Sequence, residues 1–106
     1  MKADRIANKN AQEYVDRAEP FQGSNLFGEY DGSDEGSNTP YVVYSYGYHF
    51  PMFIFINGHW YENSDKYSRS TSKQQSQARP TMKTIKLNTD DMRKLLWNNA
   101  MERINQ

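Results

Sequence analysis

Catalysis needs side chains that can move protons, attack a substrate or hold a metal ion, and this chain has few of them. It contains no cysteine, so thiolate metal sites and disulfides are excluded. The two histidines, His49 and His59, lack a partner at the HxH or HxxxH spacing of metal ligands. Lys66, Tyr67 and Ser68 are adjacent, but no nucleophile motif or glycine-rich phosphate loop accompanies them. We therefore expect no catalytic residue, metal or cofactor, and an enzyme is the most distant function considered.

Side chains suited to nucleic-acid binding are more numerous. Residues 63–86 carry six basic and one acidic side chain, a net charge of +5, whereas residues 1–38 carry four basic and eight acidic ones, a net charge of −4. Basic groups beside tyrosines could contact phosphates and stack on single-stranded bases. The same asymmetry would arise if the basic block faced the acidic part of this chain. The candidates for nucleic-acid binding are Tyr46, Tyr48, Lys66, Tyr67, Arg69, Lys73 and Arg79.

The strongest structural signal lies in residues 41–61. Two β-branched and aromatic runs, YVVYSY and MFIFI, are followed by Asn57-Gly58 and HWY, and Asn-Gly after an apolar run predicts a hairpin turn. The run 52–56 is apolar on both faces and should be covered on both. A length of 106 residues fits one domain. We predict a single α+β domain, residues 1–106, with a small antiparallel meander of three to five strands and a helix at each end.

Weaker patterns surround this sheet core. TIKL, within residues 83–87, is a further strand candidate, and a short edge strand is expected near Leu26. After the strand candidate near Leu26 comes DGSDEGSNTP, residues 31–40, which has the composition of a flexible acidic loop. Its carboxylates lack the spacing of a calcium-binding loop. The sheet core and the polar basic segment together are assigned to residues 41–87.

The N-terminal residues 1–20 are predicted to form a helix that Pro20 ends. Apolar residues recur at helical spacing from Ala3 to Ala18. Most of them are alanines, so the helix would contribute little burial.

The C-terminal helix is predicted over residues 89–104. NTDD, residues 88–91, is a helix start, with Thr89 as the cap and two acids at the positive end of the helix dipole. The apolar residues that follow cover more than half of the helix circumference, which is wider than one buried stripe needs. The inner face would comprise Met92, Leu95 and Leu96, and the second face, our candidate partner-binding or homodimer surface, Trp97, Met101 and Ile104.

The stretch from Tyr67 to Arg79 is almost wholly polar. Ser72 and Gln75 have the spacing of a capping box, which predicts a short helix that ends before Pro80. Such a helix has no apolar face beyond Ala78, so side-chain hydrogen bonds to the sheet, or a partner, must hold it. We expect five side chains to bind backbone groups, with Arg69, Lys73 and Arg79 pointing outward; the five are Asp65, Lys66, Ser68, Thr71 and Ser72.

The motifs YSYGYHFP, WYENSDKYS and STSKQQSQ, within residues 44–77, together resemble a pattern of small uncharacterised proteins from tailed bacteriophages and related mobile elements. The resemblance covers about a third of the chain. It implies phage provenance and a recurring small fold, and the family has no established activity. The pattern would have histidine where this chain has Gln74, which argues against an essential imidazole there.

These observations favour a non-enzymatic, phage-type accessory protein that binds a host protein and modulates or inhibits host defence or nucleic-acid machinery. A nucleic-acid-binding module that uses residues 66–86 is the alternative. The longest apolar run, residues 52–56, is too short to span a bilayer, and Met1 does not begin a signal peptide. We therefore expect no membrane contact and a location in the cytoplasm of an infected bacterial host.

Overall fold

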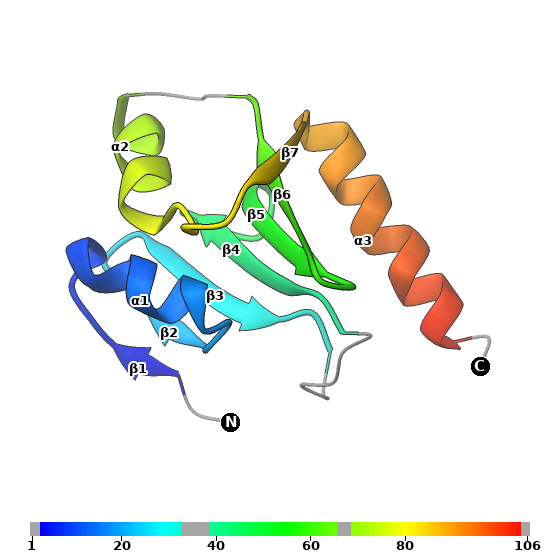
Figure 1. Ribbon diagram of the computed structural model, residues 1–106, viewed down its shortest axis with the longest axis horizontal. Coiled ribbons are helices and arrows are strands. Elements are labelled where there is room, and N and C mark those ends of the chain that lie inside the picture. Colours follow the sequence, from blue (N-terminus) through cyan, green and yellow to red (C-terminus); the bar gives the residue numbers. More distant parts are fainter. Residues whose placement is uncertain (1–2, 33–38, 66–68, 105–106) are drawn as a thin grey trace.

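The computed structural model describes residues 3–32, 39–65 and 69–104, without the side chains of residues 69–71. In this part of the chain, seven strands form one sheet in the order of the sequence (Figure 1). The strands are β1 (Asp4–Arg5), β2 (Phe21–Gln22), β3 (Leu26–Tyr30), β4 (Tyr41–Ser45), β5 (Pro51–Ile56), β6 (His59–Asn63) and β7 (Thr84–Leu87). The helical elements are the 3-10 turn η1 (Asn8–Asn10), α1 (Ala11–Asp16), α2 (Arg69–Ala78) and α3 (Thr89–Ile104).

The broad α+β class fits, but the prediction of an antiparallel sheet with three to five strands was wrong. The sheet has seven strands and is mixed, because β1 pairs with β2, and β6 with β7, in parallel. A parallel pair requires a crossover connection, and η1 with α1 supplies the first while α2 supplies the second. The strand near Leu26 is also an interior strand between β2 and β4, not an edge strand.

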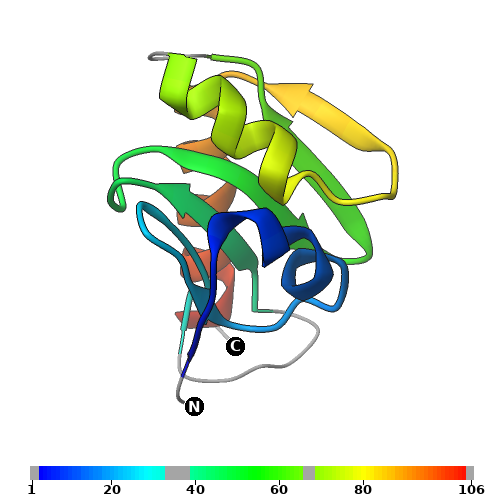
Figure 2. The ribbon, with the colours of Figure 1, turned by 90° about the vertical axis from the view of Figure 1, so that its left-hand side faces the viewer.

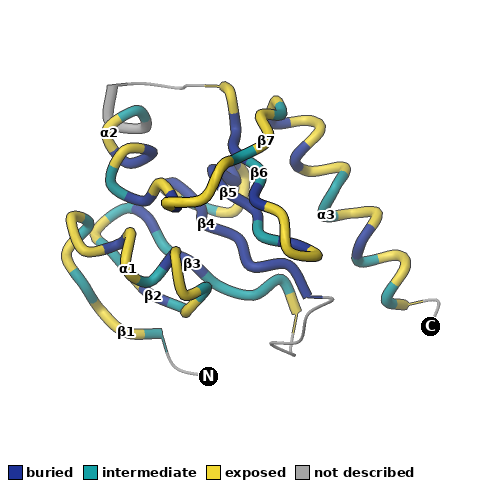
Figure 3. Tube along the Cα trace, viewed as in Figure 1, coloured by how far each residue is buried: buried dark blue, intermediate teal, exposed yellow. Residues whose placement is uncertain are grey.

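Helices cover both faces of the sheet. Figure 2 shows α1 and α2 in front of the strands and α3 behind them. The first face carries a cluster that includes Val15 from α1 and Ala78 from α2, packed with Tyr41, Phe53 and Trp60. The second carries a cluster in which Met92 of α3 meets four sheet residues, namely Val42, Tyr44, Ile54 and Ile56. Strand β5 contributes to both clusters, so its predicted coverage on both faces is confirmed (Figure 3).

The predicted hairpin is present between β5 and β6. Asn57 and Gly58 both have positive φ, 53° and 81°, as a type I′ turn requires. Pro51 begins β5 as expected. The pairing of β4 with β5 shifts after Val43, so Met52 is an extra residue in its strand. As a result, Met52 and Phe53 both enter the cluster under α1 and α2.

The predicted N-terminal helix is wrong over its first half. Residues 4–5 form β1 and η1 follows, so the α-helix begins only at Ala11 and ends at Asp16. The Asn8 side chain accepts a hydrogen bond from the Ser24 backbone N–H (2.9 Å) and donates one to Asn25 Oδ1 (2.8 Å). These bonds to the β2–β3 turn compete with helix formation.

Two further predictions are confirmed, and a third falls largely on residues that the structure does not describe. TIKL forms the strand β7, and the C-terminal helix covers residues 89–104, so both are confirmed. Most of the predicted loop 31–40 lies outside the described residues. No helix in the described ranges has the length and hydropathy that a bilayer span would need.

The cluster under α1 depends on a close approach at Gly28. The Tyr41 hydroxyl lies against this glycine and donates a hydrogen bond to the Glu19 carbonyl at 2.7 Å. A Cβ atom at position 28 would lie 2.6 Å from the Phe21 ring and nearer still to the Tyr41 hydroxyl. Only glycine therefore leaves room for this bond.

We predict that Gly28→Ala lowers the free energy of unfolding by about 1–3 kcal/mol, the usual result of overpacking a well-filled core. Urea denaturation followed by fluorescence would measure it. Gly47→Ala is the matched control, because its added Cβ would lie no closer than 3.3 Å to His49. Equal stability of the two variants would contradict the close-approach interpretation.

Candidate functional site

The candidate site is the outer face of α3, and the first question is how the helix is held in place. Asn88, the residue before α3, accepts a hydrogen bond from the Asp91 backbone N–H at 2.8 Å, which is the bond of an N-cap. The predicted cap, Thr89, is instead the first helical residue. Its side chain is directed to the sheet, where it accepts a hydrogen bond from Asn63 at 3.0 Å.

Asn63, at the end of β6, joins four segments of the chain and is only 1% exposed. Its side-chain amide donates to the Pro51 carbonyl (2.8 Å) and to the Thr89 hydroxyl (3.0 Å), and its Oδ1 accepts from the Asp65 N–H (2.8 Å). Its backbone carbonyl accepts from the Gln75 side chain at 2.7 Å. One residue thus ties β5, α2 and α3 together.

We predict that Asn63→Ala lowers the free energy of unfolding by about 3 kcal/mol or more. The change removes three hydrogen bonds and leaves buried partners unpaired, and each such group costs about 1–3 kcal/mol. Chemical denaturation would measure the difference. Asn98→Ala, an exposed asparagine of α3, is the control and should be within about 0.5 kcal/mol of the parent. A mild effect at Asn63 would contradict its role as the junction.

Asp65 adds a second bond to the start of α3. Its carboxylate accepts a hydrogen bond from the Thr89 backbone N–H at 2.9 Å, so the expectation that Asp65 binds a backbone group is confirmed. Hydrogen bonds from the Thr89 backbone and side chain hold the pKa of Asp65 below its ordinary value. The charged carboxylate therefore stabilises the folded state.

A carboxylate whose pKa is lowered by folding stabilises the protein above its unfolded pKa, about 3.9, and this contribution disappears as the pH falls through the folded pKa. We therefore expect Asp65→Asn to lower the melting temperature at pH 7. The gap to the parent should close as the pH falls below the unfolded pKa and through the lower, folded pKa of Asp65. Asp90→Asn, at the same helix end, controls for the helix dipole. A gap that does not depend on pH would contradict the assignment.

The remainder of α3 is also fixed by polar contacts. Arg103 donates to Asn99 Oδ1 (2.8 Å) and to the Asp31 carbonyl (2.9 Å), and its guanidinium lies 3.7 Å from the Asp31 carboxylate. Nearer the N-terminus, Arg93 donates to the His49 carbonyl. The helix is therefore attached to the sheet and its loops at both ends.

The two faces predicted for α3 are present. On the inner face Met92 is fully buried, and Leu95 and Leu96 pack partly buried against the same cluster. On the outer face Trp97 is 67% exposed, Met101 39% and Ile104 74%. These three positions are related as i, i+4 and i+7, so the apolar stripe is about 10 Å long at 1.5 Å per residue. We refer to Trp97, Met101 and Ile104 below as the outer stripe.

The nucleic-acid candidates in the described part of the chain are only partly brought together: Asn25, which donates a hydrogen bond to the Tyr46 hydroxyl, lines a cavity with Lys73, whereas Tyr48 lies elsewhere. Tyr46 and Tyr48 are exposed in the β4–β5 turn. The Tyr48 ring packs against Phe27 and Tyr44 on the α3 side, and its hydroxyl donates to Glu29, a bond that raises the pKa of Tyr48. Lys73 lies on α2, across the sheet. Lys66 and Tyr67, and the side chain of Arg69, lie outside what the structure describes.

Arg79 was expected to point outward, and it is exposed, but it also has a partner on the sheet. Its guanidinium forms an ion pair with Glu62 at 3.0 Å. Glu62 is buried on β6 and also accepts a hydrogen bond from the Thr84 hydroxyl at 2.7 Å. A buried carboxylate needs such partners, so Arg79 serves to connect the end of α2 to the sheet.

Helix α2 differs from its prediction at the start and agrees in how it is held. It begins at Arg69, so Ser72 lies inside the helix and cannot be its cap. Gln75 is not a capping partner either, because its side chain reaches the Asn63 carbonyl. Side-chain hydrogen bonds to the sheet were expected and are present: besides Gln75, Ser45 on β4 donates to the buried Gln74. Lys66, Ser68 and the Thr71 side chain are not described.

Sequence reasoning missed Asn63, Glu62 and Gln74 as structural residues. One usable signal existed on α2, since Gln74, Gln75 and Ala78 share a helix face and Ala78 was the one apolar residue identified. No comparable local pattern marks Asn63. Within the described ranges, no group of three or more His, Asp or Glu side chains could hold a metal ion.

Comparisons with family models, with curated proteins and with solved structures find no match to this chain. Function is therefore inferred from the surfaces of the molecule and their chemistry.

Proposed function

We propose that this protein is a non-enzymatic accessory protein that binds another protein through the outer stripe of α3. The observation that supports this best is Trp97, which is 67% exposed on a helix fixed at both ends. Exposed tryptophan is unusual on a surface without a partner, and tryptophan is enriched among the residues that carry most of the energy of an interface.

The rigidity of α3 favours binding. The entropy of ordering an interface segment reduces affinity, and this helix is already ordered by the bonds from Asn63 and Arg103. Side chains at i, i+4 and i+7 are the pattern with which a helix enters an apolar groove.

The proposed partner is a protein with an apolar groove. The resemblance of this chain to phage proteins favours a partner that belongs to the bacterial host. A second copy of the chain is less well supported. A stable interface buries about 800 Å² on each partner, and a stripe of three side chains about 10 Å long is small for a flat, self-complementary contact. A groove that encloses the stripe would bury more of each side chain.

Nucleic-acid binding is supported less well. Arg79 is paired with Glu62, and Tyr48 packs on the opposite side of the sheet from Lys73. Lys73, Lys83 and Lys86 remain exposed and could contact phosphates, which would make binding depend steeply on salt.

The proposal predicts that Trp97→Ala and Met101→Glu abolish capture of a protein partner from nuclease-treated host lysate. Once the partner is identified by mass spectrometry, calorimetry should show that Trp97→Ala weakens binding by about 2 kcal/mol or more. Both variants should melt as the parent does, because the two side chains are exposed. Asn98→Ala, on the same exposed face of α3, is the matched control and should bind normally.

Two results would contradict the proposal. One is a folded Trp97→Ala variant that retains its protein partner. The other is a partner that is no longer captured after nuclease treatment. If the double variant Lys73→Glu with Lys83→Glu also fails to capture it, the result would favour nucleic-acid binding. Loss of self-association in the Trp97 variant, measured by light scattering, would instead assign the stripe to a homodimer.

A further inference from the structure

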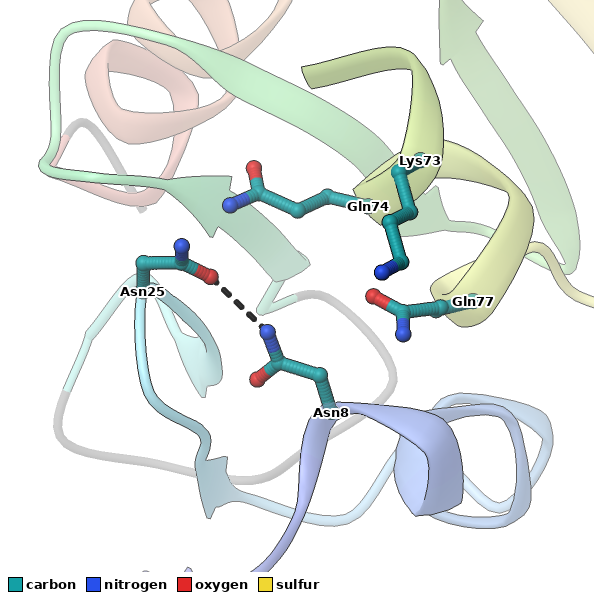
Figure 4. Close-up of a pocket in the computed structure, with 5 residues that line it drawn as sticks. All are labelled: Asn8, Asn25, Lys73, Gln74 and Gln77. Carbon is teal, nitrogen blue, oxygen red and sulfur yellow. Dashed lines mark hydrogen bonds between the residues drawn. The ribbon is translucent and has the colours of Figure 1, made fainter. Parts of the chain in front are cut away.

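A second candidate site lies on the opposite face of the sheet from the outer stripe. A cavity of about 210 Å³ opens between α2, η1 and the β2–β3 turn (Figure 4). Its volume corresponds to about seven water molecules. Five side chains line it, all of them polar: Asn8, Asn25, Lys73, Gln74 and Gln77.

Gln74 is the unusual member of this lining. It is 2% exposed, and its Oε1 accepts a hydrogen bond from the buried Ser45 hydroxyl. Its Nε2 has no hydrogen-bond partner among the described residues. Buried amides in folded proteins are almost always satisfied by protein or by ordered water, so this N–H group calls for an acceptor from outside the described chain, which water or a ligand oxygen could supply.

The opposite wall of the cavity is already fixed by internal bonds. Asn8 donates to Asn25 Oδ1 at 2.8 Å, as Figure 4 shows, and accepts from the Ser24 N–H at 2.9 Å. Asn25 in turn donates to the Tyr46 hydroxyl at 3.4 Å. The donors that remain available on the other wall are the Lys73 ammonium group and the side-chain amides of Gln74 and Gln77, all on α2.

We propose that this cavity is a binding site for a small oxyanion, a carboxylate or a phosphate group, received by Lys73 and the Gln74 amide. The one charged group in the lining is the Lys73 ammonium, and no acidic side chain lines the cavity. A cation would therefore meet repulsion and no carboxylate. An oxyanion would form an ion pair with Lys73 and accept a hydrogen bond from the buried N–H of Gln74. Hydrogen bonds with a charged partner are stronger than those between neutral groups.

The size of the cavity limits the ligand. Sites for drug-sized molecules occupy about 300–1,000 Å³, so this one fits an ion or a small metabolite, or the anionic end of a larger molecule. Carboxylate and phosphate share the required chemistry, and the test below separates them.

The test is an NMR titration of the full-length protein, with the Gln74 side-chain NH₂ resonances as the direct readout. Sodium glutarate and sodium phosphate are added in separate experiments at constant ionic strength, and sodium chloride serves as the blank. We expect a saturable shift of the Gln74 resonances with at least one of the two oxyanions. Saturation with glutarate alone assigns the carboxylate, and saturation with phosphate alone assigns the phosphate.

Lys73→Gln should weaken this binding about tenfold, because it removes a bond to a charged group, and the substitution is at an exposed helical position. The matched control is Lys94→Gln, which removes the same charge from α3 and should bind the anion as the parent does. Absence of a saturable shift with both oxyanions, or an equal affinity in the Lys73 variant, would overturn the proposal. Neither result depends on the outer stripe, which is tested separately with Trp97.

Discussion

The packing of α2 and α3 depends on Asn63, whose backbone carbonyl binds α2 and whose side chain binds α3. This residue ends β6, and it is bonded at the same time to β5 beside it, to Gln75 of α2 on one face and to Thr89 of α3 on the other. Neither helix could be positioned by apolar contacts alone. Among the side chains of α2 that the structure describes, the buried ones are two glutamines and an alanine, and α3 contributes one fully buried side chain, Met92.

The same principle extends through the rest of the structure. The chain has a mean hydropathy of −1.03 and 36% hydrophobic residues, so aromatic rings fill the two clusters and buried polar groups connect the layers. Glu62 forms an ion pair with Arg79, and Arg103 donates hydrogen bonds to the Asn99 side chain and the Asp31 carbonyl. Buried polar networks of this kind stabilise a fold only when their members are satisfied, and they then specify one arrangement. Against this background an unsatisfied amide, that of Gln74, is an exception.

Local signals in the sequence predicted the parts of the fold that local interactions determine. The Asn57-Gly58 turn, strands β4, β5 and β7, and helix α3 all follow from turn residues, β-branched runs and helix starts. Strands β1 and β2 have two residues each, too few for any periodic pattern. The parallel pairing of β6 with β7 could have been predicted from the sequence, because a helix between two strands is the usual crossover connection of a parallel pair. The roles of Asn63 and Gln74 could not be predicted, since their partners on other strands and helices lie 12 to 29 residues away in sequence.

The polar attachment of α3 also explains why its apolar surface is wider than the core needs. A helix held only by burial would turn its largest apolar side chain, Trp97, toward the sheet. Here the bonds at Thr89 and Arg103 fix the rotation of the helix about its axis, and they place Met92 inward. Trp97 lies five residues further on, about 140° around a helix of 3.6 residues per turn, and so faces solvent. The outer stripe therefore contributes little to folding, and its apolar character needs another explanation, which binding supplies.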